Sequence, residues 1–220
     1  MVERCGITAQ NLAREAYGPD IALPEIRLYG HLDATFPYIL SHLEYIVGEL
    51  LRNSIQALVE RQRDWHVDSK AIEVTICEAP QHVIIRISDQ GGGIPRDLLP
   101  YLWSFSKGPR SQARLENLLK VPKMAATMQE LEGAHGSKHG HGHGHGHGQL
   151  RDSSLSALTS RPPNLRLGMG LPMSRVYAEY WAGNLSLHSL EGYGVDAFLQ
   201  ISKLGNKNEQ LSTRASMDCV

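Results

Sequence analysis

Hydrophobic and polar residues alternate with two different periods along this chain. Residues 40–63 carry the longest pattern of helical spacing, and they predict one long amphipathic helix. Several shorter segments alternate with a period of two residues, as strands do; these are 25–29, 72–76, 82–89, 184–189 and 195–201. Weaker helical signals occupy four further segments, namely 7–17, 95–103, 112–119 and 168–181.

The order of these elements predicts an α/β fold of the α+β sandwich kind, with a mixed sheet and helices on one face. Regular strand–helix alternation, as in a Rossmann fold, is absent from the pattern. The strands at 72–76 and 82–89 are separated by a short turn, so we expect them to pair as a hairpin. Residues 104–166 have little periodicity, and a connection of this length is typical of a functional lid or an insert.

Composition adds few constraints. The 220 residues are 41% hydrophobic and 20% charged, which is typical of a globular domain, and the formal net charge is −1. This balance offers no electrostatic argument for a nucleic-acid partner. The sequence has no apolar run of transmembrane length, so we expect no membrane span. The cysteines Cys5, Cys77 and Cys219 are odd in number and far apart, which suggests reduced thiols.

Glu49 and Asn53 lie four residues apart in the long helix, so their side chains share a face. An asparagine amide oxygen is a suitable hard ligand for Mg²⁺. A carboxylate one turn earlier can serve as a general base beside that metal. Taken alone, the pair is more typical of a solvated helix face.

Two glycine-containing turns also indicate a ligand site. Asp89 ends a predicted strand and precedes three glycines, which let the backbone approach a ligand closely. Its carboxylate can accept a hydrogen bond from an exocyclic amine, although an ordinary tight turn is the alternative. Gly168-Met169-Gly170 opens the last predicted helix, and amides at a helix N-terminus form a natural anion site. A single Gly-x-Gly is a weak signal.

Together these motifs resemble the GHKL (Bergerat) ATP-binding fold with its long ATP lid. They occur in the family's order as Glu49-x-x-x-Asn53, Asp89-x-Gly-Gly-Gly93 and Gly168-x-Gly-Leu-Pro. Longer strings are similar to the mitochondrial protein kinases, which comprise the pyruvate dehydrogenase kinases and the branched-chain α-ketoacid dehydrogenase kinase. These strings lie at 86–94, 170–175, 177–180 and 189–194.

The resemblance implies an ATP- and Mg²⁺-dependent protein serine kinase of the mitochondrial matrix, acting on an α-ketoacid dehydrogenase complex. Glu49 would be the general base, Asn53 the Mg²⁺ ligand, and Asp89 the partner of the adenine amine. The other ATP-binding residues that it implies are Arg52, Gly91, Gly93, Ser106, Lys107, Gly168, Met169, Gly170 and Leu171.

Three positions depart from the family pattern. Arg166 stands where a third glycine is usual, and its guanidinium either pairs with a phosphate or blocks the loop. Val195 replaces a threonine whose hydroxyl supports the adenine site. Tyr45 is more like the branched-chain enzyme, whereas the string at 189–194 is closer to the pyruvate enzymes. A non-catalytic ATP-binding regulator or scaffold is therefore the main alternative. A histidine kinase is a weaker one, since no phospho-acceptor helix is visible upstream.

The resemblance also predicts the domain organisation. Residues 1–20 would be the end of a missing N-terminal helical bundle that helps to bind the lipoyl-bearing core of the complex. Residues 21–203 would form the kinase domain, with 204–220 as a flexible tail. Within the lid, the alternating His-Gly tract at 139–148 either binds Zn²⁺, Ni²⁺ or Cu²⁺ loosely or is a low-complexity expansion. A homodimer is expected only by analogy with relatives.

Overall fold

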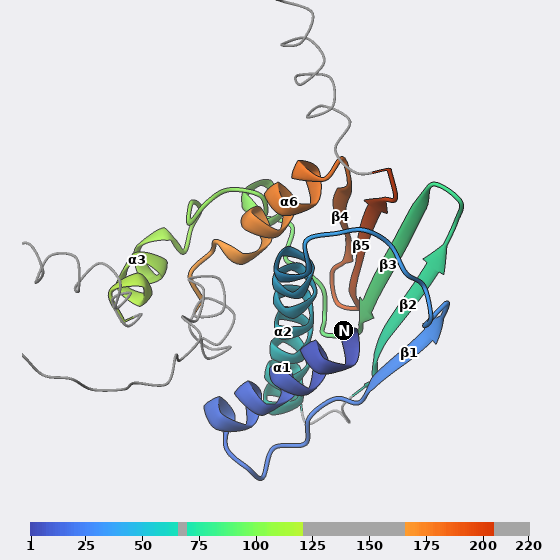
Figure 1. The fold of residues 1–220 in the computed structure, drawn as a ribbon. Helices are drawn as coiled ribbons and strands as arrows, with labels where there is room; N and C mark the ends of the chain where they lie inside the picture. The colour runs from blue at the N-terminus through green and yellow to red at the C-terminus, as the bar shows by residue number, and fades with distance from the viewer. Residues whose placement is uncertain (66–69, 121–165, 205–220) are drawn as a thin grey trace, which may run out of the picture.

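Five strands form one mixed sheet, and helices cover one of its faces (Figure 1). The computed structural model describes residues 1–65, 70–120 and 166–204. In chain order the elements are α1 (Val2–Tyr17), β1 (Ile26–Gly30), α2 (Leu40–Trp65), β2 (Ile72–Glu78), β3 (His82–Asp89), a 3-10 turn (Leu99–Tyr101), α3 (Ser111–Lys120), α6 (Gly170–Tyr180), β4 (Asn184–Leu190) and β5 (Gly194–Ser202).

The strand order in the sheet is β1-β2-β3-β5-β4. β1 runs parallel to β2, whereas the other neighbouring pairs are antiparallel. The predicted hairpin of β2 and β3 is confirmed, with Glu73 opposite Ser88 in its register. β3 lies in the middle of the sheet, so its C-terminal residue, Asp89, is positioned by strands on both sides.

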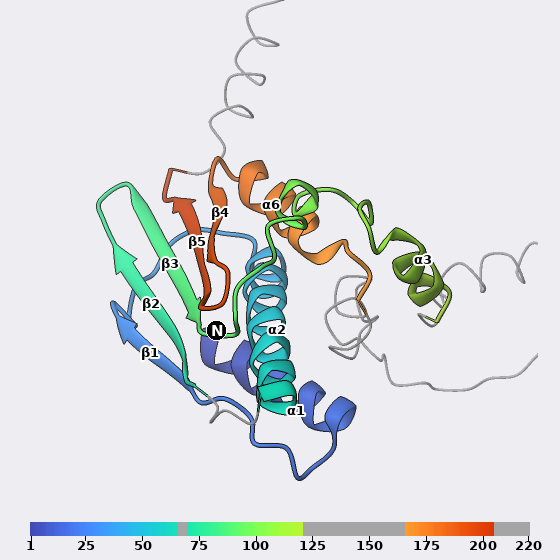
Figure 2. The ribbon, with the colours of Figure 1, turned by 180° about the vertical axis from the view of Figure 1, so that it is seen from behind.

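The core lies between the covered sheet face and helices α1, α2 and α6 (Figure 2). Alternate residues of β3, such as Val83, Ile85 and Ile87, are buried because successive side chains of a strand point to opposite faces. They pack in the same cluster as the apolar stripe of α2, which includes Val47 and Leu51. Burying each such side chain contributes about 1.5–3 kcal/mol. The predicted α/β fold with helices on one face is confirmed.

Two predicted helices differ from the structure. α1 begins at Val2, five residues before the predicted start, because the buried residues Val2, Cys5 and Ala9 recur at helical spacing and extend the apolar stripe to the N-terminus. The helix expected over 95–103 is wrong. That segment forms turns and a three-residue 3-10 helix around Pro100, whose missing N–H prevents a regular helical hydrogen-bond ladder.

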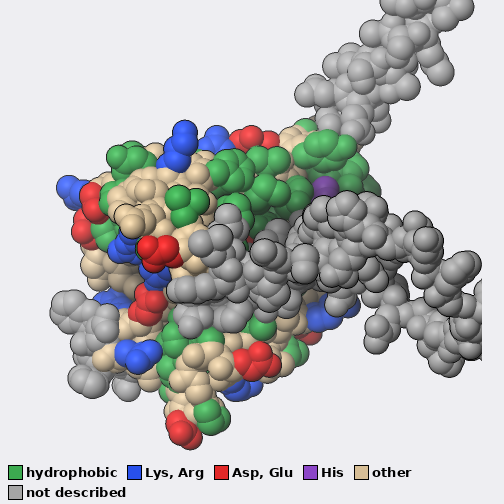
Figure 3. Space-filling model, turned by 90° about the vertical axis from the view of Figure 1, so that its left-hand side faces the viewer, with side chains coloured by type: hydrophobic (Ala, Val, Ile, Leu, Met, Phe, Trp, Pro, Cys, Tyr) green, Lys and Arg blue, Asp and Glu red, His purple; other side chains and the backbone are tan. Residues whose placement is uncertain are grey.

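The surface agrees with the balanced composition. Basic and acidic side chains are interspersed over the face shown in Figure 3. Across the described ranges, no helix is long and apolar enough to cross a membrane. The His-Gly tract at 139–148 and the tail from residue 205 lie outside the described residues, so the predictions made for them stay predictions.

Candidate functional site

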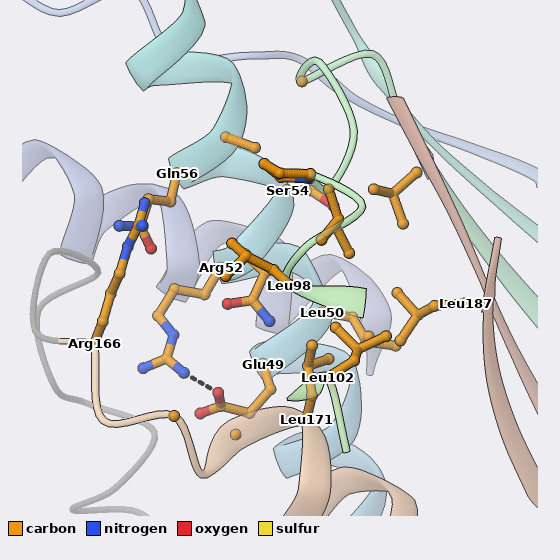
Figure 4. Close-up of a pocket in the computed structure, with 18 of the residues that line it drawn as sticks. Glu49, Leu50, Arg52, Ser54, Gln56, Leu98, Leu102, Arg166, Leu171 and Leu187 are labelled. Carbon is orange, nitrogen blue, oxygen red and sulfur yellow. Dashed lines mark hydrogen bonds and ion pairs between the residues drawn. The ribbon is translucent and has the colours of Figure 1, made fainter. Parts of the chain in front are cut away.

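A cavity of about 780 Å³ lies beside α2 (Figure 4). Its walls come from α2, the turn after β3, the segment around the 3-10 helix, α3, and the stretch that enters α6. The predicted site residues that line it are Glu49, Arg52, Asn53, Asp89, Gly91, Gly93, Gly168, Gly170 and Leu171. A volume of this size is in the range of about 300–1,000 Å³ that small-molecule sites occupy.

Asp89 forms one end of the cavity and is only 6% exposed. Its Oδ2 accepts a hydrogen bond of 2.7 Å from the Ser54 hydroxyl, and its Oδ1 accepts one of 2.9 Å from the Gly91 amide. Burial raises the pKa of the Asp89 carboxyl, and these two hydrogen bonds, together with one from the Val195 backbone, partly oppose the rise. An ionised carboxylate can accept about four hydrogen bonds, so it retains capacity for a ligand amine.

The glycine turn after Asp89 depends on missing side chains. A Cβ on Gly91 would lie 2.5 Å from the Ala57 Cβ, so only glycine lets the turn approach α2. Gly93 has a φ of +76°, and a Cβ there would lie 2.3 Å from the Leu190 carbonyl oxygen. Arg61 of α2 donates hydrogen bonds to the carbonyls of Gln90 and Tyr193, which fixes the turn on both sides.

Glu49 and Asn53 differ in exposure although they share the cavity face of α2. Glu49 is 1% exposed and forms a buried ion pair with Arg52, one turn along the helix. Figure 4 shows this pair reaching toward the segment that enters α6. Asn53 is exposed and lines the cavity, so its amide oxygen is accessible to a ligand or a metal ion.

The segment entering α6 forms the opposite wall. Gly168, with a φ of +68°, and Gly170 both line the cavity, while Met169 is the N-cap of α6 and lies outside the lining. Ser106 donates a hydrogen bond of 2.7 Å from its hydroxyl to the Leu167 carbonyl, and its amide donates one of 3.0 Å to the Gly168 carbonyl. These bonds join the two described ends of the 104–166 connection.

Ser106 and Lys107, which the resemblance assigns to ATP binding, are not among the residues that line the cavity. The lysine side chain is exposed, and its backbone carbonyl accepts a hydrogen bond of 2.6 Å from Arg114 of α3. Both residues instead contact segments that line the cavity: Ser106 bonds to Leu167 and Gly168, and Lys107 bonds to Arg114. Their assignment as ATP-binding residues stays a prediction.

Of the three residues that depart from the family pattern, two line the cavity and one lies outside its lining. Arg166 lines the cavity and pairs with Glu60 of α2 at 2.5 Å, so its side chain lies along α2 instead of filling the loop. Val195 lines the cavity opposite Asp89 in the β3–β5 register. Tyr45 is buried and packs edge-on against Tyr177, outside the cavity lining.

Several lining residues were not predicted from the sequence, namely Ser54, Gln56, Leu98, Leu102 and Leu187. Ser54 carried a usable signal, because a serine inside a helix is unfavourable unless its hydroxyl has a partner. The leucines carried none, since they read as ordinary core residues. Among the described side chains, no group of three or more His, Cys, Asp and Glu could hold a metal ion.

A strand-end carboxylate, a glycine turn packed on a helix, and a second glycine segment at a helix N-terminus together define a nucleotide-binding domain of the GHKL class. The family model described as "Histidine kinase-, DNA gyrase B-, and HSP90-like ATPase" matches residues 39–204. The chain belongs to this family, and ATP with Mg²⁺ is the expected ligand pair.

The chain is also similar to particular members of this class, which supports the predicted resemblance to the mitochondrial protein kinases. It is 32% identical over 207 residues to the mitochondrial pyruvate dehydrogenase (acetyl-transferring) kinase of Arabidopsis thaliana, covering 92% of this chain and 45% of the relative. It is 30% identical over 228 residues to the mitochondrial pyruvate dehydrogenase (acetyl-transferring) kinase 2 of Saccharomyces cerevisiae. This match covers 92% of this chain and 46% of the relative. The chain thus spans less than half the length of these relatives.

Proposed function

We propose that this chain is the ATP-binding catalytic domain of a protein serine kinase that acts on the pyruvate dehydrogenase complex in the mitochondrial matrix. The names of its relatives support this assignment, because they are mitochondrial pyruvate dehydrogenase kinases. The observation that carries it is one cavity, in which Glu49 and Asn53 of α2 meet Asp89 and the Gly168–Gly170 segment.

The base of the nucleotide would bind at Asp89. Its carboxylate would accept a hydrogen bond from the adenine amine, while Ser54 and Gly91 hold it in position through the bonds they already donate. The cavity wall near this end includes the apolar side chains Leu187 and Val195, which suit the flat face of a base. The absence of a Cβ at Gly91 keeps the turn close to α2, and its absence at Gly93 keeps the turn close to the end of β4.

The phosphates and the metal would lie toward the Gly168–Gly170 segment. Amides at the N-terminus of α6 point positive partial charge toward an anion. Asn53 fits an Mg²⁺ ligand, because its side chain is an oxygen donor exposed to the cavity. Mg²⁺, when bound, would neutralise phosphate charge, and phosphoryl transfer depends mainly on such neutralisation and on positioning.

Glu49 would serve as the general base that accepts the proton of the substrate serine. Its carboxylate lines the cavity, but Arg52 occupies one side of it. Since the Arg52 guanidinium covers one side of the Glu49 carboxylate, Arg52 would have to turn toward the phosphates as the substrate arrives. Arg52 is therefore the residue that links nucleotide binding to the availability of the base.

Docking and assembly complete the proposal. We infer that a segment outside this chain provides the contact with the lipoyl-bearing core, since the relatives are more than twice as long as this chain's match to them. Residues 1–20, which include helix α1, would be the end of a helical bundle that makes this contact, with residues 21–203 as the kinase domain. A homodimer is proposed by analogy with GHKL relatives alone.

The test measures binding and transfer separately. Glu49→Gln should abolish transfer of labelled phosphate from ATP to the pyruvate dehydrogenase complex and leave ATP affinity within about threefold of wild type. Asn53→Ala should weaken the binding of ATP in the presence of Mg²⁺. Glu44→Gln is the matched control, since Glu44 lies on α2, pairs with Arg4 and is absent from the cavity lining.

Transfer is assayed with both the pyruvate and the branched-chain complexes, because Tyr45 resembles the branched-chain enzyme. Transfer to the branched-chain complex alone would overturn the substrate assignment. Absence of transfer to either complex by a full-length protein that binds ATP would overturn the kinase assignment. It would favour a non-catalytic ATP-binding regulator, which the Glu49–Arg52 pair and the apolar Val195 also suit.

A further inference from the structure

Three arginines converge on the side of the cavity that faces the α6 N-terminus. Arg110 and Arg114, at the start of α3, and Arg166 all line the cavity. Arg114 packs directly on Gly168, since a Cβ there would lie 2.6 Å from the Arg114 Cδ. Burial lowers the pKa of Arg114, and the positive charges of Arg110 and Arg166 lower it further. This wall of the cavity is therefore rich in mutually repelling positive charge.

Glu60 of α2 is the acidic partner of Arg166 in this wall. One guanidinium nitrogen of Arg166 donates to both carboxylate oxygens of Glu60, at 2.6 and 2.5 Å. The two side chains are 42% and 44% exposed, and pairs of this kind contribute only about 0–1 kcal/mol. Gln56 also donates to Glu60, at 3.0 Å, so the carboxylate has another partner if Arg166 leaves.

The backbone at Arg166 is anchored independently of this ion pair. The Arg166 carbonyl accepts a hydrogen bond of 3.1 Å from the Asn117 side chain. The next carbonyl, of Leu167, accepts the bond from Ser106, and the Leu167 side chain is buried. Moving the guanidinium from Glu60 into the cavity therefore requires only side-chain rotation. Figure 4 shows the side chain extended beside Gln56, at the edge of the cavity.

We propose that Arg166 is a phosphate-binding residue, which is held on Glu60 before the nucleotide binds and exchanges this carboxylate for the terminal phosphate of ATP. This inference rests on the proposed function, because it assigns a contact within the same nucleotide site. A phosphate carries more charge than a carboxylate and forms strong, often bidentate bonds with a guanidinium. It also relieves the repulsion among Arg110, Arg114 and Arg166.

The exchange predicts opposite effects for its two partners. Arg166→Gln should weaken ATP binding by about tenfold or more, ADP binding by less, and adenosine binding not at all. Glu60→Gln should strengthen ATP binding by up to about fivefold, because the carboxylate that competes for Arg166 is lost. If the ion pair serves only to hold the segment in place, both variants would weaken ATP binding to the same extent, and the proposal would be overturned.

The experiment uses calorimetric titration of the 220-residue chain with ATP, ADP and adenosine in the presence of Mg²⁺. Arg27→Gln is the charge-matched control, since Arg27 forms an exposed pair with Glu25 on the far edge of the sheet. It should leave all three affinities unchanged. Arg166→Lys, which keeps the charge but loses the guanidinium fork, should fall between wild type and Arg166→Gln, and it covers the case in which the glutamine variant fails to fold.

The outcomes separate the two proposals. A wild-type chain that binds no ATP would overturn the nucleotide site and this assignment together. A wild-type chain that binds ATP, with Arg166→Gln binding it equally well, would overturn the assignment of Arg166 and leave the nucleotide site intact. Equal losses for ATP, ADP and adenosine in Arg166→Gln would also overturn the assignment, because a contact with the terminal phosphate cannot affect adenosine.

Discussion

The hydrogen bond between Ser54 and Asp89 gives a direct test of how the base end of the cavity is built. Ser54→Ala removes the bond of 2.7 Å that the hydroxyl donates to a buried carboxylate. A hydrogen bond to a charged group contributes about 1.5–3 kcal/mol, so we expect the free energy of unfolding to fall by that amount at neutral pH. The pKa of Asp89, already raised by burial, should rise further, since the Ser54 bond opposes that rise.

The sign of the pH dependence follows from this shift. A carboxyl whose folded pKa lies above its unfolded value destabilises the fold in its ionised form, and this cost is lost as the pH falls below the folded pKa. Urea unfolding at about pH 7.5 and about pH 4.5 should therefore show a larger loss for Ser54→Ala at the higher pH.

Ser174→Ala is the matched control for this measurement. Ser174 is fully buried in α6, and the described part of the chain offers its hydroxyl no hydrogen-bond partner. Its replacement should lower the free energy of unfolding by less than about 0.5 kcal/mol, or should raise it. A loss for Ser54→Ala below about 0.5 kcal/mol, or one equal at both pH values, would refute the reasoning.

Three further predictions concern separate parts of the molecule. Asp89→Asn should keep the fold, because it removes a buried charge, and weaken ATP binding by about tenfold or more in calorimetric titration; unchanged affinity would contradict the adenine assignment. Gly93→Ala should cost at least about 1–2 kcal/mol in urea unfolding, because its φ is +76° and the Leu190 carbonyl leaves no room for a Cβ; wild-type stability would contradict this. Burial lowers the pKa of His42 in the folded state. The neutral imidazole therefore stabilises the fold fully above the pKa of the unfolded chain, and this stabilisation is lost as the pH falls through the pKa of the folded chain. His42→Phe keeps the stacking on Tyr177 and should therefore show a smaller decrease in Tm between about pH 7.5 and about pH 5 than wild type, and an equal decrease would contradict it.

Much of the fold could be predicted, because long periodic segments carry their own signal. The strand over 82–89 and the start of α2 at Leu40 agree with the structure, since alternation and helical spacing are strong in both. The expected helix over 95–103 is wrong because Pro100 lies in its interior and lacks the N–H that a regular helix needs, although Pro95 suits a first turn. The sheet order is a tertiary property, and the pattern alone contained no information on β5 lying between β3 and β4.

The site was predictable where chemistry is local in sequence. Asp89 and its glycines, and the face shared by Glu49 and Asn53, are read from neighbouring residues, and the structure brings them to one cavity. The Arg166–Glu60 pair joins residues 106 positions apart, so no local pattern could indicate it. The ion pair of Glu49 with Arg52 could have been predicted from the sequence, because residues three apart on a helix are neighbours.

The central place of β3 has a consequence for how quickly different parts of the cavity open. Asp89 ends a strand that is hydrogen-bonded along both edges, and Arg61 fixes the following turn. The wall formed by Leu167 and Gly168 is held by the two bonds from Ser106 and a few side-chain contacts. Amide hydrogen exchange should therefore be slowest at the base end and fastest at the phosphate end, so a nucleotide would enter a preformed base pocket and order its phosphate wall afterwards.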